Sequence, residues 1–328
     1  MDNFDVNGSN FVLYNDDCLN VLPSIPSESV SFACIDGPYN IKVHNSYSSE
    51  KQKWDSKSKK DFIEFTLKWL NEVYRILKPD GSLYTFYGFT EIETWLEIIR
   101  QSKFTNHLEN AIVLAKSKGR GTKHKLKSIR EDLFHLTKHP KKYIWNSESY
   151  LRRVIANYHN KGWEKRGWDY GPDGETPMRY TSVGNVLPLF MEPGFENQKK
   201  GTVVDIATGE PMAWSGLDVD VQFPTIPSYV NPIEKNFHTN QKPIILLSML
   251  ALICSEDGDR ILDCFAGSMS MGVASLITGR NFIGIEQAKD TYKVGLQRIK
   301  DTDLPRWDNF VKTHIKADNS KKFKFGIL

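Results

Sequence analysis

Short apolar runs alternate with amphipathic segments through the first part of the chain. Short apolar runs predict strands, and apolar residues recurring every three or four positions predict helices. On this pattern we expect strands at 11–14, 30–35, 82–87 and 111–115 and helices at 61–77 and 91–101. The Lys-Pro-Asp-Gly sequence at 78–81 ends the longer helix directly before the next strand. Alternation of this kind predicts a mostly parallel sheet with helices on both faces.

The same alternation returns near the end of the chain, with expected helices at 243–254, 271–278 and 290–300 and strands at 260–263 and 281–285. In between, Gly, Pro, Trp and Tyr become frequent, helical periodicity ends after 149–158, and a hairpin is expected at 202–212. We therefore expect a catalytic part at 1–142, a separate module at 143–235, a cofactor-binding part at 236–300 and a basic tail at 301–328.

With 328 residues, 40% of them hydrophobic, the chain can form one α/β core and a smaller module. Its four cysteines form no CxxC pair, which fits a reducing compartment. The chain has no leader pattern and no apolar run near the ~18 residues of a membrane span, so we expect a cytoplasmic protein without a membrane partner. The eight histidines are scattered, and no metal site is expected.

The net charge of +3 conceals one basic stretch, because residues 116–142 hold ten Lys or Arg against two acids, Glu131 and Asp132. Such a stretch is typical of a nucleic-acid contact and equally of a solvated surface. The module at 143–235 also interleaves basic and aromatic side chains. Charge alone leaves both interpretations open.

A candidate ligand site follows two of the later strands. One strand ends at Asp263 and runs into a turn of small residues around Gly267, and the next strand ends on Glu286. Glycine lets a ligand approach the main chain, and an acid about 20 residues further on can accept both hydroxyls of a ribose. Because Met269 and Met271 stand where a dinucleotide site has small residues, a nucleoside is favoured over a pyrophosphate, although an ordinary strand-to-helix turn has a similar sequence.

A candidate catalytic site, Asp36-Gly37-Pro38-Tyr39, follows the strand at 30–35. An exocyclic amine on a base is a poor nucleophile because its lone pair is delocalised into the ring. The Asp36 carboxylate and the Gly37 carbonyl can accept its N–H groups, and Tyr39 can stack on a base taken out of the helix. Taken alone, the same four residues also form an ordinary turn.

Together these motifs resemble the amino-methyltransferases of DNA that carry a D/N/S-P-P-Y/F/W motif, in the β-group order of catalytic motif, recognition region and cofactor motif. The resemblance also covers the segments at 13–19, 73–82 and 238–243. It implies a Rossmann-like α/β fold with a mostly parallel seven-stranded sheet, an inserted target-recognition module, S-adenosylmethionine as cofactor and double-stranded DNA as partner. Dimers are frequent in that family, but no apolar patch in this sequence demands one.

The resemblance also implies site residues. Asp36 and Tyr39 form the catalytic pair, with Gly37 and Pro38 between them. The residues expected around the cofactor are Asp17, Cys18, Asp36, His238, Asn240, Gln241, Lys242, Asp263, Phe265, Ala266, Gly267, Ser268, Glu286 and Gln287. In this set Asp17 binds the adenine amino group, Glu286 the ribose, and residues 240–242 the methionine end. Two departures stand out: Gly37 replaces the family's first Pro, and Met269 with Met271 is expected to narrow the pocket.

The residues expected to contact DNA follow the strand at 111–115 or lie in the module. They are Lys116, Lys118, Arg120, Lys123, Lys125, Arg130 and Arg166. Phosphate contacts of this kind supply affinity and register but little sequence information. The polar loop at 44–60, directly after the catalytic motif, is expected to close over the DNA.

Asp at the first motif position favours N6-adenine methylation within this family. The expected protein is therefore a site-specific adenine methyltransferase of a prokaryotic or phage-infected cell, of the restriction-modification type. Methylation of N4 of cytosine, or of RNA, is the alternative reaction. A catalytically silent DNA-binding homologue or subunit is the alternative class, because Gly37 and Met269 depart from the family pattern.

Overall fold

The computed structural model describes residues 1–40, 57–122, 125–146, 152–156, 169–170, 177–182, 186–188, 242, 244–303 and 306. For 115–129 and for the strands between 152 and 188 the description covers the backbone alone.

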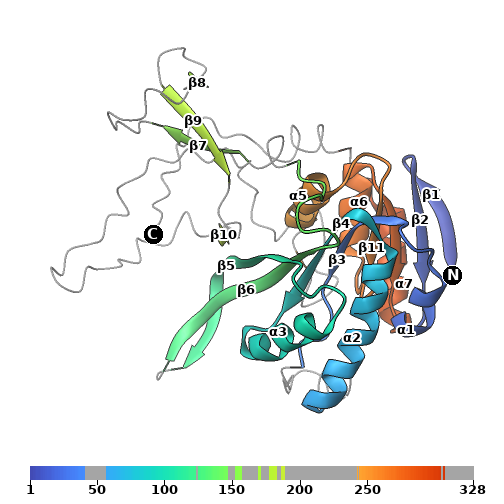
Figure 1. Ribbon diagram of the computed structural model, residues 1–328. Helices are drawn as coiled ribbons and strands as arrows, with labels where there is room; N and C mark the ends of the chain where they lie inside the picture. Colours follow the sequence, from blue (N-terminus) through green and yellow to red (C-terminus); the bar gives the residue numbers. More distant parts are fainter. Residues whose placement is uncertain are drawn as a thin grey trace.

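Nine strands of the described residues form one sheet in the order β1-β2-β12-β11-β3-β4-β6-β5-β10 (Figure 1). In that order the strands are Asp2–Val6, Ser9–Tyr14, Asn281–Ile285, Arg260–Asp263, Val30–Ile35, Leu77–Tyr87, Lys125–Thr137, Leu108–Thr122 and Val186–Pro188. The run from β2 to β4 is parallel, β6 is antiparallel to both neighbours, and β1 is antiparallel to β2. The mostly parallel sheet is confirmed, and β1 and β10 flank the expected seven strands.

Helices cover both faces of the sheet, as the alternating pattern predicts. One buried cluster joins a face of the sheet to α5 (Ile244–Cys254), α6 (Ser270–Thr278) and α7 (Lys289–Asp301). The other joins the opposite face to α1 (Cys18–Val21), α2 (Lys59–Ile76) and α3 (Ile92–Gln101), with short 3₁₀ turns at Leu22–Ser24 and Phe89–Glu91. None of the helices in the described part of the chain has both the length and the hydropathy of a membrane span.

The strand and helix boundaries follow from local sequence. Strands β3 and β11 are buried along nearly their whole length, as expected for the middle of a parallel sheet. Helix α2 begins two residues earlier than expected because Ser58 caps it, its Oγ accepting from Asp61 N at 3.1 Å. The expected helix stop at 78–81 lies in an irregular first part of β4, where the register with β3 shifts.

Three expectations need correction. Residues 2–6 form β1, which the sequence did not predict. The strand expected at 111–115 is part of a long hairpin of β5 and β6, which alternation of apolar residues does not reveal because its outer part is rich in Lys, Ser and Gly. Arg152–Ala156 is strand β7 rather than helix, which suits its Val-Ile pair. The hairpin expected at 202–212 and most of the tail lie outside the described residues.

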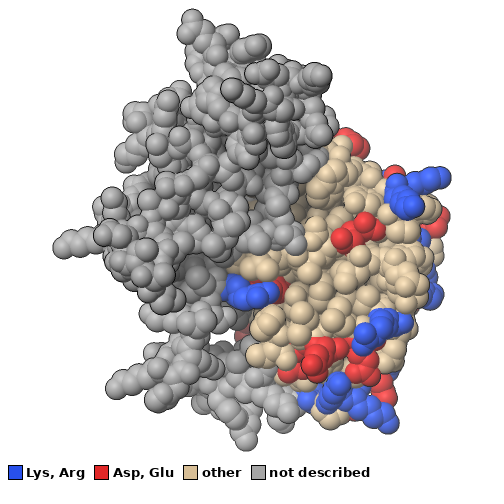
Figure 2. Space-filling view, turned by 60° about the vertical axis from the view of Figure 1, so that its left-hand side comes forward, with Lys and Arg blue, Asp and Glu red and all other residues tan. Residues whose placement is uncertain are grey.

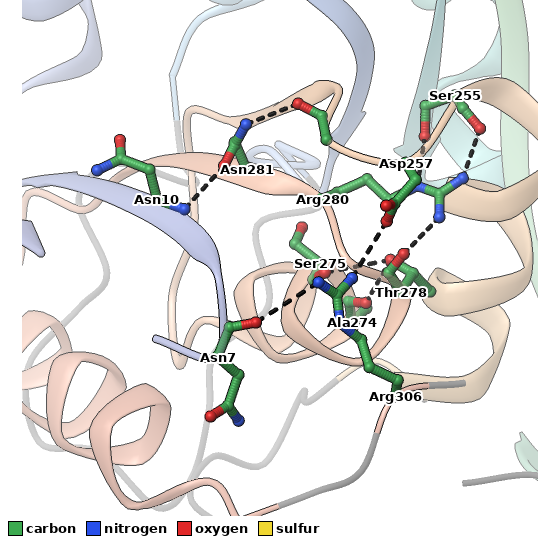
Figure 3. Close-up of polar contacts among 11 residues, drawn as sticks. Asn7, Asn10, Ser255, Asp257, Ala274, Ser275, Thr278, Arg280, Asn281 and Arg306 are labelled. Atoms are coloured by element: carbon green, nitrogen blue, oxygen red, sulfur yellow. Dashed lines mark hydrogen bonds and ion pairs between the residues drawn. The ribbon is translucent and has the colours of Figure 1, made fainter. Parts of the chain in front are cut away.

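Polar contacts hold the amino-terminal edge of the sheet together (Figure 3). The buried Arg280 donates to Ser255 O at 2.6 Å and to Thr278 O, the ends of α5 and α6. Arg306 donates to Asp257 Oδ1 at 3.1 Å and to Asn7 O at 3.5 Å. Since carbonyls at helix ends lack partners within the helix, Arg280 acts structurally. Arg306 joins the turn between β1 and β2 to the segment before β11. The candidate site lies at the opposite edge.

Candidate active site at the carboxyl edge of the sheet

Three neighbouring parallel strands end together at the candidate site. In the sheet order β12-β11-β3, the residues that follow these strands are Glu286, Cys264 and Asp36. A Cβ placed on Gly37 would lie 3.4 Å from the Phe265 ring, so the candidate catalytic tetrapeptide packs directly against the turn after β11. The structure thus brings together two motifs more than 200 residues apart. This is the edge at which open α/β sheets bind ligands.

The turn after β11 is held by Glu286. Gly267, with φ of 51°, donates its N–H to Glu286 Oε2 at 2.9 Å, and Ala288 N donates to Oε1 at 2.7 Å. Ala266 N donates to Ile285 O at 2.9 Å. Of the described residues, a Cβ on Gly267 would meet only the Phe265 carbonyl oxygen, at 3.9 Å, so these residues leave the space over the turn open. Each carboxylate oxygen of Glu286 keeps a further lone pair for a ligand hydroxyl.

The residues expected beside the cofactor adenine lie next to this turn. Asp17 caps α1, its Oδ1 accepting from Leu19 N at 2.8 Å, and its Oδ2 accepts from Gln287 Nε2 at 3.4 Å. Cys18 is buried, and burial together with a hydrogen bond to Cys18 raises the pKa of Cys264. Asp17, Glu286 and Gln287 therefore border one site, while the Cys18 thiol lies beneath it in the core.

Met269 and Met271 do not narrow this pocket. Both side chains are buried in the core, with exposed fractions of 0% and 1%. Met269 has a left-handed backbone conformation at the start of α6, and its side chain passes under the turn to β12 and α7. A Cβ on Gly284 would lie 3.1 Å from its sulfur, and one on Gly295 only 2.3 Å from its Cγ. The expectation was wrong because the sequence does not show these two glycines making room.

We expect Gly295→Ala to destabilise the protein by about 1–3 kcal/mol, the usual cost of overpacking a core. The added methyl displaces Met269 and, with it, the turn that Met269 supports. Denaturant unfolding checks this, with Val294→Ala as the control, because Val294 is 40% exposed on the same helix and should change stability by less than about 0.5 kcal/mol. Equal midpoints for Gly295→Ala and the wild type would contradict the packing described.

The buried Arg298 of α7 supports the other end of the turn. Its Nη1 donates to Ser268 O at 2.8 Å and to Ser270 Oγ at 3.0 Å. Ser268 is itself 6% exposed. Its side chain therefore faces the protein interior, whereas the neighbouring Gly267 borders the space over the turn.

Asp263, at the end of β11, is an unusual carboxyl group. Burial raises its pKa to about 8, opposed by the hydrogen bond from Phe265 N at 3.0 Å and reinforced by the charges of Asp36 and Glu286. At neutral pH the group is therefore mostly protonated, and it can donate as well as accept a hydrogen bond.

We expect the stability of the protein to fall as the pH rises from 3.8, the ordinary value for Asp263, toward 8. The folded state holds this proton more tightly than the unfolded state, so the unfolding free energy decreases through that window. In Asp263→Asn the difference in unfolding free energy between pH 5 and pH 8 should be smaller by more than about 1.4 kcal/mol, the equivalent of one pKa unit. Denaturant unfolding at pH 5 and pH 8 measures it. An unchanged difference between the two pH values would contradict the protonated state.

The candidate catalytic tetrapeptide, 36–39, forms a polar cluster with two distant residues. Tyr39 OH donates to Asp36 Oδ1 at 2.6 Å, and Lys242 Nζ lies 2.9 Å from Asp36 Oδ2 and 3.3 Å from Tyr39 OH. Glu131 Oε1, from β6, lies 3.6 Å from the same ammonium. Lys242 was expected at the methionine end of the cofactor, and the structure places it against Asp36. Glu131 was not predicted as a site residue. The one sequence feature that could have indicated it is its position as an acid within a basic stretch.

Five of the predicted DNA contacts lie on the β5–β6 hairpin. The last pair between β4 and β6 is Tyr87 with Asp132, so the strand segments that hold Lys116, Lys118, Arg120 and Lys125 continue past the end of β4, at the candidate-site edge. Arg130 forms a bidentate ion pair with Asp132, and its guanidinium lies 4.3 Å from the centre of the exposed Phe89 ring. The predicted residues Lys123, Arg166, His238, Asn240 and Gln241 and residues 44–56 of the loop lie outside the described part.

Acidic and basic side chains intermingle on the face shown in Figure 2, on either side of a broad uncharged area. The coloured residues on this face therefore form no concentrated basic surface. Among the described residues, no group of three or more His, Cys, Asp and Glu side chains is arranged to hold a metal ion.

Comparison with known proteins agrees with this geometry. A family model described as DNA methylase matches residues 30–297. DNA adenine methyltransferase YhdJ of Escherichia coli (strain K12) is 28% identical over 310 residues, covering 94% of this chain and 85% of that protein. Type II methyltransferase M.HpaI of Haemophilus parainfluenzae is 24% identical over 301 residues, covering 92% and 77%.

Two solved structures share the fold. PvuII DNA methyltransferase (cytosine-N4-specific) superposes with a TM-score of 0.56 at 14% identity, over 93% of this chain and 91% of that one. TTHA0409 from Thermus thermophilus, in complex with S-adenosyl-L-methionine, superposes with a TM-score of 0.50 at 17% identity, over 88% and 92%. The family match spans both the tetrapeptide at Asp36 and the acid at Glu286, and with it the resemblance is confirmed: the chain belongs to the DNA methylase family.

Proposed function

We propose that this protein transfers the methyl group of S-adenosylmethionine to the N6 amino group of adenine, in a base turned out of double-stranded DNA. One observation carries the proposal: the tetrapeptide at Asp36 packs against the open, glycine-containing turn that Glu286 holds. An amine held by the first can therefore reach a methyl donor held by the second. The donor supplies an electrophilic methyl group when bound.

The residues present fit such a donor. The open space over Gly267 admits a ligand close to the main chain, Glu286 keeps lone pairs for ribose hydroxyls, and Asp17 lies beside them as an acceptor for an adenine amino group. Asp263 and Phe265 lie in the same turn, toward Asp36. The proposal also includes the expected contacts of His238 and of residues 240–242 with the cofactor.

On the catalytic side, Asp36 accepts one N–H of the target amine, and the Gly37 carbonyl is the second acceptor. Together they favour a pyramidal nitrogen whose lone pair points at the methyl group. With the donor bound, the nitrogen would take the methyl group while the S–C bonding electrons stayed on sulfur, and the positive charge on the nitrogen would lie beside the Asp36 carboxylate. The methylated amine would then release one proton to solvent water. Tyr39, tethered to Asp36 through its hydroxyl, presents its ring to the base.

Adenine is favoured over cytosine by Asp36 at the first motif position and by the similarity to YhdJ, an adenine methyltransferase. The backbone of the β5–β6 hairpin, beyond the end of β4, supports a role for its Lys and Arg residues in binding phosphates. The separate three-stranded sheet β7-β9-β8, with β8 at Asp169–Tyr170 and β9 at Pro177–Ser182, supports a target-recognition module at 143–235.

Incubation with methyl-labelled cofactor and mixed-sequence duplex DNA, followed by digestion to nucleosides, tests the proposal. N6-methyladenine is the expected product. Labelled N4-methylcytosine would instead identify cytosine as the substrate base. No product from a folded protein that binds the cofactor would point to a silent DNA-binding homologue.

A further inference from the structure

Lys242 is a buried lysine at the centre of the candidate site. Its side chain is 9% exposed, and its ammonium lies over the rings of Phe86, at 4.7 Å, and Tyr39, at 5.6 Å. Burial works to lower the pKa of Lys242, but Asp36 and Glu131 outweigh this and raise the pKa above its ordinary value. Lys242 is therefore a permanent positive charge inside the site.

A buried ammonium is retained only where its partners are well placed, since leaving water costs several kcal/mol. Here two carboxylates share it. Asp36 Oδ2 lies 2.9 Å from Nζ and comes from the end of β3, while Glu131 Oε1 lies 3.6 Å from Nζ and comes from β6. The ammonium thus joins the β5–β6 hairpin to the catalytic strand end.

The charge of Lys242 acts on Asp36 against acidic surroundings. Among the described residues, the titratable groups that face Asp36 are the Tyr39 hydroxyl, the Lys242 ammonium, the carboxyl groups of Glu131 and Asp263, and the Cys34 thiol. Among these, Lys242 alone carries positive charge. Without it, the Asp36 carboxylate would lose the cation that lies 2.9 Å from its Oδ2 and fixes its orientation. The charged Glu131 carboxylate would then have no ammonium between it and Asp36.

We propose that Lys242 is a positioning residue for the methyl transfer: it holds the Asp36 carboxylate as an oriented acceptor, and it shares its charge with Glu131. The catalytic part of this inference rests on the proposed function. The ion pair between Lys242 and Asp36 is present in the folded protein without any ligand, so it can be measured whether or not DNA is the substrate.

The first test is the pH profile of kcat for the wild type, Lys242→Met and Lys242→Arg on duplex DNA. Loss of a charge within about 4 Å moves a carboxyl pKa by about one to three units, so the acid limb of Lys242→Met should move upward by that amount. We expect the loss of kcat at pH 6 to reach about tenfold at the upper end of that range, and to recover to within about threefold at pH 9. Lys242→Arg keeps the charge and should keep the acid limb in place, even at a lower rate.

Glu131→Gln should not move the acid limb of the kcat profile upward, in contrast to Lys242→Met. It removes an acid near Asp36 and leaves the ammonium to Asp36, so the acid limb should stay or move downward. Lys78→Met is the matched control, because Lys78 forms a 2.8 Å ion pair with Asp259 at the opposite edge of the sheet. It should leave the profile unchanged. Superimposable profiles for wild type and Lys242→Met, in an active enzyme, would overturn the inference and leave the proposed function standing.

A second test needs no activity. In protein labelled with ¹³C at the aspartate carboxyl, the resonance missing from Asp36→Asn reports the titration of Asp36. This resonance should titrate at a higher pH in Lys242→Met than in the wild type, and should not do so in Glu131→Gln. If Lys242→Met does not fold, a rise in Glu131→Gln overturns the inference on its own.

Discussion

Replacing Asp36 with alanine is expected to lower kcat about a thousandfold while the affinity for S-adenosylmethionine changes by less than about threefold. Removal of one preorganised group that stabilises developing charge costs roughly 10²–10³ in kcat, and Asp36 also orients Tyr39 through the 2.6 Å hydrogen bond. The variant also leaves Lys242 without its nearer carboxylate. Single-turnover transfer of a labelled methyl group measures the first quantity, and calorimetric titration measures the second.

Asp257→Ala is the control for Asp36→Ala, because Asp257 is an exposed acid that binds Arg306 at the amino-terminal edge (Figure 3). It should leave both quantities at wild-type values. Retention of a tenth or more of the transfer rate by Asp36→Ala would refute the assigned role of this carboxylate.

Glu286→Ala should have the opposite signature, a dissociation constant for the cofactor raised about 100-fold, or about 2.7 kcal/mol. The variant removes the acceptor of the Gly267 and Ala288 N–H groups, at 2.9 and 2.7 Å, and with it the ribose acceptor. Hydrogen bonds to charged groups contribute about 1.5–3 kcal/mol each. At saturating cofactor, transfer should recover most of its rate. Calorimetric titration and the cofactor dependence of turnover measure this.

Asp290→Ala is the control for Glu286→Ala, because Asp290 is an exposed acid in the first turn of α7, four residues further on. It should leave the dissociation constant within about threefold, since an exposed charge near a helix start contributes about 0.3–1 kcal/mol. An unchanged constant in Glu286→Ala itself would mean that the acid does not hold the cofactor turn.

The central strands could be predicted to the residue. Strands 30–35, 260–263 and 281–285 have the predicted bounds, because strands buried on both faces are continuous apolar runs. Strand β6 escaped prediction because its outer half, at 125–131, is mostly polar and follows a basic run. Its pairing with β4 depends on contacts between segments about 50 residues apart, which periodicity does not report.

The same limit applies to the candidate site. Asp36 and Glu286 could be named from sequence because each follows an apolar strand, and parallel strands end at one edge. Glu131 could not, since it reaches the site only through the unpredicted strand β6. The position of Lys242 follows from its ion pair with Asp36, 206 residues earlier by the difference of their numbers, and no local pattern encodes such a pair.

Met269 links three segments through the volume of one side chain. A Cβ on Gly295 would lie 2.3 Å from the Met269 Cγ, whereas a Cβ on Gly284 would lie closer to the Phe282 ring, at 2.6 Å, than to the Met269 sulfur. Substitutions at 295 and 269 should therefore compensate one another: Gly295→Ala combined with Met269→Ala should be less destabilised than the sum of the two single changes. Related chains that carry a larger residue at 295 are expected to carry a smaller one at 269, so that these two positions vary together.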